Sequence, residues 1–276
     1  MTEPTQIFAA RPWADRAAEG PARRVPTMLT EEERQYYAWL CRDWMQGAGE
    51  VVDLGCFAGG STAWLATGHA AAGHPGLVHA FDFFTVSEDL KAALLYPAGI
   101  APFKGEDMLA LSRALLEPWD ARVTFHRGNL LAKRWPAEDP VEILVIDAAK
   151  STALADHIAR QFFPALIPGR SVVVQQDFLH RVQPWLPAQM ELFAEFFEPL
   201  AHLPDASVSF LCRKVPSAGE IAARQLEGRD DAALTALIME ASARLAPLCP
   251  APRFARQCQS LAEAPGTRLS WKFPRG

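Results

Sequence analysis

Five short apolar runs, separated by stretches of helical character, constrain the fold of this chain more than any other feature. The runs are rich in Val, Ile, Leu and Phe and read EVVDLG, LVHAFDFF, RVTFHRG, EILVIDAA and RSVVVQQDF. Continuous apolar strands that alternate with helices are typical of a parallel sheet covered on both faces. We therefore expect an α/β fold whose helices flank a mainly parallel sheet.

The order of the elements sharpens this expectation. We expect helices over residues 61–67, 106–116, 152–166 and 185–197, and an earlier helix after Thr30, because Thr30 and Glu33 match a capping box. After the fifth run, the segments LAHLP and SVSFLCRK lie close enough in sequence to pair as an antiparallel hairpin at the sheet edge. The prediction is a Rossmann-like, doubly wound, seven-stranded sheet whose last strand is antiparallel.

The chain also divides by composition. Residues 1–26 lack periodicity and are expected to form an extended arm, residues 27–215 the main domain, and residues 216–276 a helical extension. Residues 83–105 are longer than a plain strand-to-helix loop, so they are expected to be a lid or substrate wall, with an inert surface insertion as the alternative. The extension is expected to pack on the main domain or on a second copy, which leaves a homo-oligomer open.

Composition narrows the classes of partner. A chain of 276 residues that is 50% hydrophobic can bury one sizeable core, and its net charge of -5 disfavours a dedicated nucleic-acid binder. The five cysteines form no CxxC pair, so neither a zinc site nor a disulfide framework is expected. The N-terminus lacks a signal-type apolar core and no later stretch is long enough to span a membrane. We expect a soluble, cytoplasmic protein with a small-molecule partner.

The turn after the first strand carries the clearest motif, DxGxxxGGS, which runs from Asp53 to Ser61. Gly55 and Gly59 allow a close approach of the backbone to a ligand, but a dinucleotide fold needs GxGxxG to seat its pyrophosphate. A carboxylate at Asp53 suits the positive charge of S-adenosylmethionine and would repel a pyrophosphate. Asp82, at the end of the second strand, is placed to accept hydrogen bonds from ribose hydroxyls.

At these residues the chain resembles the class I S-adenosylmethionine-dependent methyltransferases, over residues 50–214. Within them it is similar to the bacterial small-molecule O-methyltransferases related to macrocin O-methyltransferase and the cephalosporin-type 7-α-methoxylation proteins. The resemblance makes residues 27–215 a methyltransferase domain. It also implies that Asp53, Gly55 and Gly59 line the methionine side of the cofactor, with Asp82 at the ribose and Asn129 at the adenine. Further candidate cofactor contacts are the loop residues Cys56, Phe57 and Ser61, and Asp147, which could contact the ammonium group. The family more often has Asp where this chain has Asn129.

Two further strand ends carry residues suited to the chemistry. The fourth ends in IDAAKS, with Asp147 and Lys150, and the fifth in VVVQQDFLH, with Asp177 and His180. Methyl transfer to a hydroxyl requires a positioned acceptor oxygen and a base that removes its proton. Lys150, His180 and Asp177 are the candidate catalytic residues.

A metal is the open question at this edge. The spacing of Asp147 and Lys150 resembles the catechol and caffeoyl-CoA O-methyltransferases, in which the Asp binds a metal and the Lys is the base. That resemblance predicts a Mg²⁺ site on Asp147 and Asp177. However, the family's first carboxylate on the fifth strand falls on Gln175 or Gln176 here, and so few carboxylates make a weak site.

Without a metal, His180 is the leading base, because histidine exchanges protons near neutral pH; its alternative is a solvent-facing loop residue. Lys150 could instead be a surface or phosphate-facing residue. Other residues near these strand ends are assigned structural roles (His126, His157) or an apolar acceptor wall that could equally be core (Phe83, Phe84, Trp185).

The leading hypothesis is an O-methyltransferase that acts on a hydroxyl of a sugar or secondary metabolite. A catalytically idle S-adenosylmethionine-binding partner protein is the first alternative, because the metal ligands are incomplete. An NAD-dependent oxidoreductase is disfavoured by the missing GxGxxG and by the absence of a recognisable Tyr-x-x-x-Lys pair.

Overall fold

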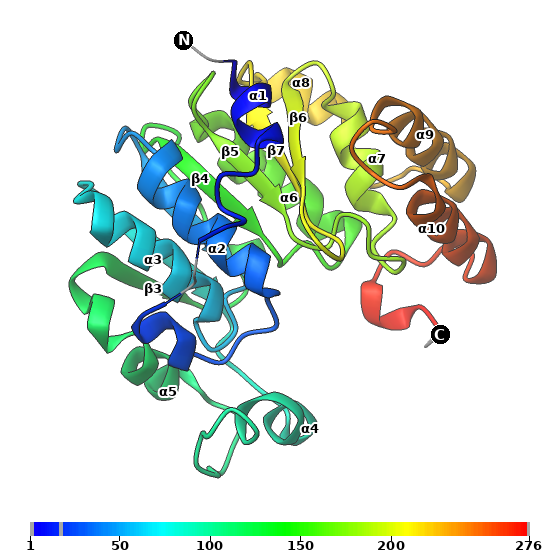
Figure 1. Cartoon of the computed structure of the whole chain (residues 1–276). Helices are drawn as coiled ribbons and strands as arrows, with labels where there is room; N and C mark the ends of the chain where they lie inside the picture. The colour runs from blue at the N-terminus through cyan, green and yellow to red at the C-terminus, as the bar shows by residue number, and fades with distance from the viewer. Residues whose placement is uncertain (1–2, 17–18, 275–276) are drawn as a thin grey trace. The chain divides into compact units, whose positions relative to one another are not determined.

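The computed structural model describes residues 3–16 and 19–274, and its strands form one seven-stranded sheet in the order β3-β2-β1-β4-β5-β7-β6 (Figure 1). β1 pairs in parallel with β2, β2 with β3 and β4 with β5, whereas β7 is antiparallel to both β5 and β6. The strands are β1 (Glu50–Leu54), β2 (Val78–Asp82), β3 (Val123–Arg127), β4 (Val141–Ile146), β5 (Val172–Gln175), β6 (Phe197–His202) and β7 (Val208–Cys212). The predicted Rossmann-like α/β fold with an antiparallel last strand is confirmed.

The chain divides into two compact units, Arg11–Lys133 and Met1–Ala10 with Arg134–Gly276. The first unit holds β1 to β3. Its helical segments are η1 (Pro21–Arg24), α2 (Glu31–Trp39), η2 (Leu40–Trp44), α3 (Gly60–Ala72), α4 (Glu88–Leu90), η3 (Lys91–Leu95), α5 (Leu109–Leu115), η4 (Glu117–Arg122) and η5 (Leu130–Ala132).

Two local signals build the first unit around α2 and α3. Thr30 caps α2 through the predicted box, since its hydroxyl accepts from the backbone N–H of Glu33 while the Glu33 carboxylate accepts from the backbone N–H of Thr30. α3 lies directly against α2, and a Cβ added to Gly68 would sit 2.1 Å from the carbonyl oxygen of Ala38. Glycine at this position therefore sets how closely the two helices pack.

Hydrogen bonds within the insertion after β2 hold its segments together. It contains α4 and η3, and the fully buried ammonium of Lys91 donates to the Glu88 carboxylate and to the carbonyl oxygens of Phe103 and Gly105. A buried charge of this kind is tolerated only when it is fully hydrogen-bonded. The segment is thus a structured element rather than a loose loop.

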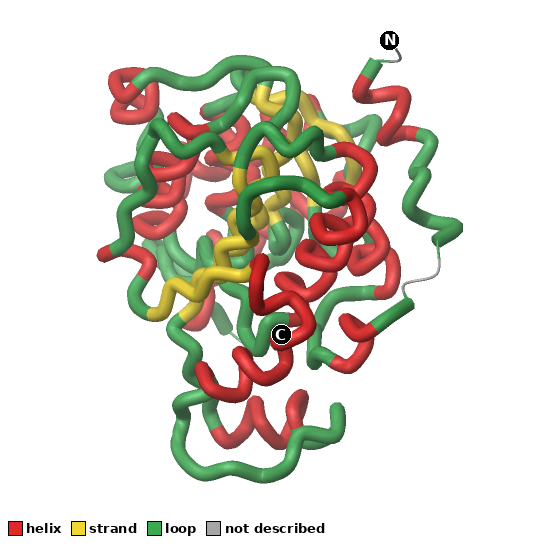
Figure 2. The backbone as a smooth tube through the Cα atoms, turned by 90° about the vertical axis from the view of Figure 1, so that its left-hand side faces the viewer, coloured by secondary structure: helices red, strands yellow, loops and turns green. Residues whose placement is uncertain are grey.

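The second unit holds β4 to β7 and the chain's C-terminal helices. Its helical segments are α1 (Pro4–Ala9), α6 (Thr152–Phe162), η6 (Phe163–Ala165), α7 (Trp185–Leu192), α8 (Ala218–Ala223), α9 (Asp231–Arg244), α10 (Ala251–Glu263) and η7 (Ser270–Lys272). Loops make up much of the remaining backbone, and most candidate site residues lie on them (Figure 2).

Several expected boundaries are wrong, for identifiable reasons. The helix expected to reach residue 197 ends at Leu192, because Phe193 and Phe197 turn inward onto Phe163, with ring centroids 5.3 and 4.9 Å apart. The arm expected to be extended contains α1, which packs against β6 and buries Phe8. Such tertiary burial is not visible in the local pattern.

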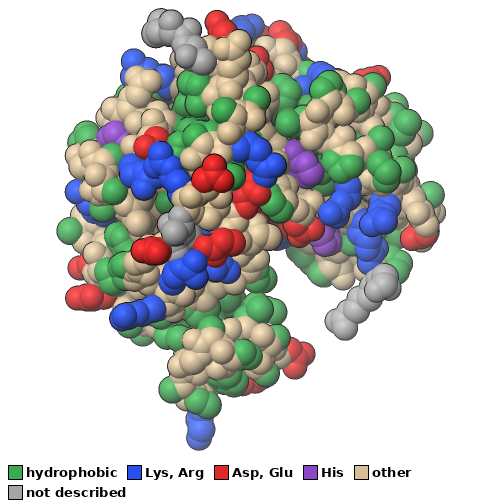
Figure 3. Space-filling model, in the orientation of Figure 1, with side chains coloured by type: hydrophobic (Ala, Val, Ile, Leu, Met, Phe, Trp, Pro, Cys, Tyr) green, Lys and Arg blue, Asp and Glu red, His purple; other side chains and the backbone are tan. Residues whose placement is uncertain are grey.

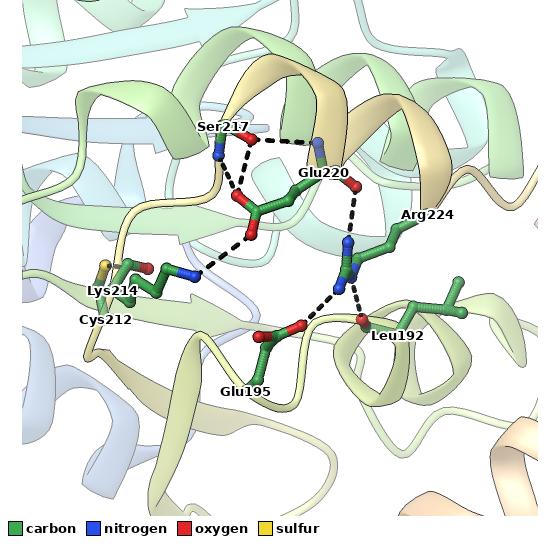
Figure 4. Close-up of polar contacts among 7 residues, drawn as sticks. All are labelled: Leu192, Glu195, Cys212, Lys214, Ser217, Glu220 and Arg224. Atoms are coloured by element: carbon green, nitrogen blue, oxygen red, sulfur yellow. Dashed lines mark hydrogen bonds and ion pairs between the residues drawn. The ribbon is translucent and has the colours of Figure 1, made fainter.

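In its described residues, the C-terminal extension contains the helices α8, α9 and α10 and the 3-10 turn η7. α8 begins at a second capping box, in which Ser217 and Glu220 satisfy each other's backbone N–H groups (Figure 4). Glu220 also accepts from Lys214, while Arg224 bonds the carbonyl oxygen of Leu192 and the carboxylate of Glu195. These contacts fix the extension to β7 and α7 within its own unit.

In the described part of the chain, no helix has both the length and the apolar character required to cross a membrane. On the face drawn in Figure 3, Lys and Arg side chains lie among Asp and Glu side chains rather than forming a field of one sign.

Candidate functional site

Asp53, at the end of β1, is buried beneath the start of α3. Its Oδ2 accepts hydrogen bonds from the hydroxyls of Ser61 at 2.7 Å and Thr62 at 2.6 Å, and its Oδ1 has no partner among the described residues. Burial outweighs these hydrogen bonds and raises the pKa of Asp53 to about 6. Thr62 was not identified from the sequence, although its place directly after Ser61 made it a candidate.

Asp82, at the end of β2, fastens the loop that follows β1. Its Oδ2 accepts from the backbone N–H of Phe57 at 2.9 Å and its Oδ1 from that of Phe84 at 2.7 Å. Phe57 has a positive φ of 51°, a strained conformation that this hydrogen bond supports. Burial raises the pKa of Asp82 despite these donors. Of the two acidic strand ends predicted to serve one ligand, Asp82 therefore bonds the loop after β1, and Asp53 bonds the first turn of α3 that follows this loop.

The glycines of this loop are required by its backbone. Gly55 and Gly59 have φ values of 96° and 101°, and a Cβ on Gly59 would lie 2.6 Å from a methyl group of Leu116. Cys56 between them is buried, and that burial raises the pKa of its thiol. The thiol is therefore a packed group rather than a reactive one.

Asn129 lies after β3, where its side-chain oxygen accepts from the backbone N–H of Leu131 at 3.0 Å and caps η5. The residue is exposed, and its amide nitrogen is a hydrogen-bond donor available to a ligand. Its capping role alone accounts for an Asn at this position, so the adenine contact stays a prediction.

The first unit fits S-adenosylmethionine on two observations. Asp53 has an orphaned, buried carboxylate oxygen at the loop, which a cation would satisfy, and Gly55 and Gly59 leave the loop backbone without side chains. A dinucleotide would place its pyrophosphate at this loop, near the carboxylate of Asp53, which is unfavourable.

In the second unit, Lys150 lies between Asp147 and Asp177. Its ammonium donates to Oδ1 of Asp147 at 2.5 Å and to Oδ2 of Asp177, which also accepts from the side-chain amide of Gln183. Partial burial disfavours the ammonium, but the two carboxylates outweigh it, so the pKa of Lys150 is raised; Lys150 likewise outweighs burial and lowers the pKa of Asp177. Lys150 is thereby held protonated and Asp177 ionised.

This donor set does not fit a divalent cation. The ammonium of Lys150 bridges the two carboxylates that would bind it, and the amide of Gln175 is buried, with its nitrogen 3.6 Å from the sulfur of Met190. Among the described residues, no three His, Cys, Asp or Glu side chains are grouped so as to hold a metal ion. Magnesium prefers several oxygen ligands in octahedral geometry, which this cluster lacks.

The loop that carries Asp177 and His180 is held by a residue far along the chain. The side-chain amide of Gln257, on α10, donates to the carbonyl oxygens of Phe178 at 2.8 Å and His180 at 3.2 Å. The His180 side chain is exposed, and its Nδ1 lies 3.4 Å from the backbone N–H of Val182. Gln183 and Gln257 were not identified from the sequence, because amide side chains carry no motif.

The C-terminal tail also reaches this cluster. The backbone N–H of Ser270 donates to the carbonyl oxygen of Lys150 at 2.9 Å, and Ser151 and Leu269 form a β-bridge. Trp185 donates its indole N–H to the carbonyl oxygen of Ala149 at 2.7 Å, which ties α7 to the same loop. The extension therefore supports the Lys150 loop within its own unit.

The other side chains considered in the sequence analysis differ in how far they are buried. Phe84 and Trp185 are fully buried, whereas Phe83 is 55% exposed. His126 stacks on Phe81 and lies 2.9 Å from His79, and burial lowers its pKa to about 4. His157 is buried in α6.

No family profile matches the chain, and no curated protein matches its sequence. Solved structures do match. The O-methyltransferase NovP is 14% identical and aligns over 68% of this chain and 82% of its own, with a TM-score of 0.53. The SAH-bound methyltransferase PaMTH1 of Podospora anserina (12% identity, 76% and 94% covered) has a TM-score of 0.48, and cofactor-bound Rv0187 from MTB (18%, 78% and 99%) one of 0.47.

The similarity to NovP and the strand order 3-2-1-4-5-7-6 lead to one conclusion. The chain has the fold of the class I S-adenosylmethionine-dependent methyltransferases.

Proposed function

We propose that this protein transfers a methyl group from S-adenosylmethionine to a hydroxyl group of a small molecule. The observation that carries the proposal is the loop after β1: its Phe57 backbone N–H donates to Asp82, and it leads into Ser61, whose hydroxyl donates to the buried carboxylate of Asp53. Its negative charge suits a sulfonium cofactor, and its glycines leave room for a close approach.

The chemistry would draw on the second unit. S-Adenosylmethionine supplies a methyl group on a positively charged sulfur. The acceptor oxygen bonds to that carbon as the carbon–sulfur bond breaks, and the hydroxyl proton passes to a base. We propose that this takes place without a divalent cation, because Lys150 already lies between Asp147 and Asp177 and neutralises one of their two charges.

Of the three catalytic candidates, His180 suits the base best. Lys150 is held protonated and Asp177 ionised by their mutual contact, so neither takes up a proton readily. The Nε2 of His180 can accept a proton only in the tautomer whose ring hydrogen is on Nδ1. In that tautomer Nδ1 no longer accepts from the backbone N–H of Val182, so this 3.4 Å contact would be lost. Lys150 and Asp177 would then position the acceptor.

Isothermal titration of the purified protein with S-adenosylmethionine tests the proposal first, with NADH as the comparison. We expect binding of S-adenosylmethionine, strongly weakened in Asp82→Asn, whose amide keeps an acceptor for only one of the Phe57 and Phe84 N–H groups and presents a donor to the other. Well-folded protein that binds NADH and not S-adenosylmethionine would make the oxidoreductase alternative the better one.

A binding protein without turnover is the second candidate. The observation that favours it is the mutual pairing of Lys150, Asp147 and Asp177, which leaves few charged groups of this cluster unengaged. A screen of hydroxylated acceptors, scored by formation of S-adenosylhomocysteine, separates the two. Turnover with any acceptor, lost in His180→Ala, rejects the idle role.

A further inference from the structure

A cavity of about 240 Å³ lies beside the N-terminal arm, within the Arg11–Lys133 unit. Arm residues 22–27 form one side, and Arg34 of α2, Trp64 of α3 and Ala98 of the insertion complete the wall. Three of the lining residues are arginines and none is acidic. The cavity therefore has a positive lining, although the chain as a whole is acidic.

The three arginines are not equally engaged. Glu31 pairs with Arg23 at 2.7 Å and with Arg34 at 3.3 Å, so one carboxylate serves two guanidinium groups. The guanidinium of Arg24 makes no hydrogen bond or ion pair with any residue that the structure describes. A guanidinium offers five N–H donors in a planar fork that matches a carboxylate or a phosphate.

Trp64 closes part of the cavity wall. Its side chain is 1% exposed, and its indole nitrogen is buried from solvent and has no hydrogen-bond partner among the described residues. Because a ligand in the cavity reaches only solvent-accessible atoms, Trp64 contributes ring surface to the wall rather than a hydrogen bond. The unengaged guanidinium of Arg24 is the group that favours a ligand with negatively charged oxygens.

The cavity also adjoins the loop proposed to bind the cofactor. A Cβ on Gly60, the first residue of α3, would lie 2.4 Å from Cβ of Thr27 and 2.6 Å from the carbonyl oxygen of Pro26. The arm that lines the cavity therefore packs directly on the end of the loop. Ala98, on another part of the wall, belongs to the insertion that the sequence predicts to be a lid or substrate wall.

We propose that this cavity binds the carboxylate or phosphate group of the methyl acceptor, so that the acceptor is an acidic small molecule. The identity of the ligand as an acceptor rests on the proposed function; the binding of an anion does not. Arg24 is the main contact.

Isothermal titration of the full chain with inorganic phosphate and with succinate, at ionic strength held constant with NaCl, tests anion binding. We expect Arg24→Gln to weaken binding by about tenfold, because it removes a charge-assisted contact. Arg16→Gln is the matched control, since Arg16 lies on the same arm outside the cavity and pairs with Asp43. Absent binding, or an equal loss in the control, would overturn the proposal.

The source of the anionic group is tested by titrating S-adenosylmethionine with and without saturating phosphate. Unchanged affinity supports an acceptor site. Competition would mean that the cavity holds the cofactor's own carboxylate, which overturns the assignment to the acceptor. A protein that binds phosphate through Arg24 but never binds S-adenosylmethionine would reject the proposed function while leaving the anion site in place.

Discussion

Replacing Lys150 with alanine is expected to turn a metal-free cluster into a weak divalent-cation site. In the wild type, the ammonium of Lys150 contacts both Asp147 and Asp177 and neutralises one of their two charges. Its removal leaves two carboxylates on neighbouring loops without their shared cation. Two such oxygen ligands attract a divalent cation, although they are too few for tight binding.

The magnitude follows from the exposure of the three side chains, which are 34%, 31% and 26% exposed. Two unit charges about 4 Å apart attract by about 4 kcal/mol at an effective dielectric constant of about 20. Solvent screening of partly exposed pairs reduces this to about 1 kcal/mol or less for each pair. We expect Lys150→Ala to lower the free energy of unfolding by about 1–2 kcal/mol.

A cation should return part of that stability. With a Kd of roughly 10⁻⁴–10⁻³ M, Mn²⁺ at ten times its Kd adds about 1.4 kcal/mol. The assay combines the electron paramagnetic resonance signal of free Mn²⁺ with urea unfolding in the presence and absence of Mn²⁺. Wild-type protein should show neither binding nor stabilisation.

Two controls isolate the cause. Lys214→Ala breaks the pair between Lys214 and Glu220 (Figure 4), which leaves a single carboxylate, so it should lose stability without gaining Mn²⁺ binding. Adding Asp177→Asn to Lys150→Ala should abolish the gain. Wild-type protein that binds Mn²⁺ as tightly as the variant, or a folded variant that binds none, would refute the reasoning.

Three further outcomes are expected. Burial raises the pKa of Asp53 to about 6, so above about pH 4 the folded protein holds this proton more tightly than the unfolded chain. Wild-type protein should therefore lose about 2 kcal/mol between pH 4 and pH 7 through this group, and Asp53→Asn should not; unfolding curves whose difference is flat across this range would contradict the shift. Gly60→Ala should lower the free energy of unfolding by about 1–3 kcal/mol, because its added methyl group would clash with the arm. Gly219→Ala, whose added methyl group would meet nothing within 4 Å, should be neutral or slightly stabilising. Equal melting temperatures of the two variants would argue against the tight contact at Gly60. Gln257→Leu should lower the free energy of unfolding by about 1–3 kcal/mol, because it removes two hydrogen bonds to the loop that carries His180. The more mobile loop should lower kcat more than it changes cofactor affinity. Unchanged amide hydrogen exchange in that loop would contradict the supporting role of Gln257.

The sheet could be predicted because its signal is local. The runs at Val51 and Val172 form strands that are buried on both sides, as is typical of a covered parallel sheet. The capping box at Thr30 places the start of α2 for a similar reason, since both partners are three residues apart.

Helix ends and supporting residues could not be predicted in the same way. α7 ends at Leu192 because Phe193 and Phe197 pack on Phe163, about 30 residues earlier in the chain. Gln257 supports the His180 loop from about 77 residues away. Neither of these long-range contacts produces a periodic pattern in the sequence.

For the candidate site, the sequence by itself determined which chemical groups stand at each strand end, since Asp53, Asp82, Asp147 and Asp177 follow apolar runs whose ends must meet one sheet edge. Only the tertiary structure decided how those groups are engaged. It placed the ammonium of Lys150 between two carboxylates that the sequence assigned to a metal, and it left the guanidinium of Arg24 in a cavity wall without a partner among the described residues. The physical reason is that a pattern fixes the direction of a strand, whereas the charge state and the partners of a side chain depend on which distant residues pack around it.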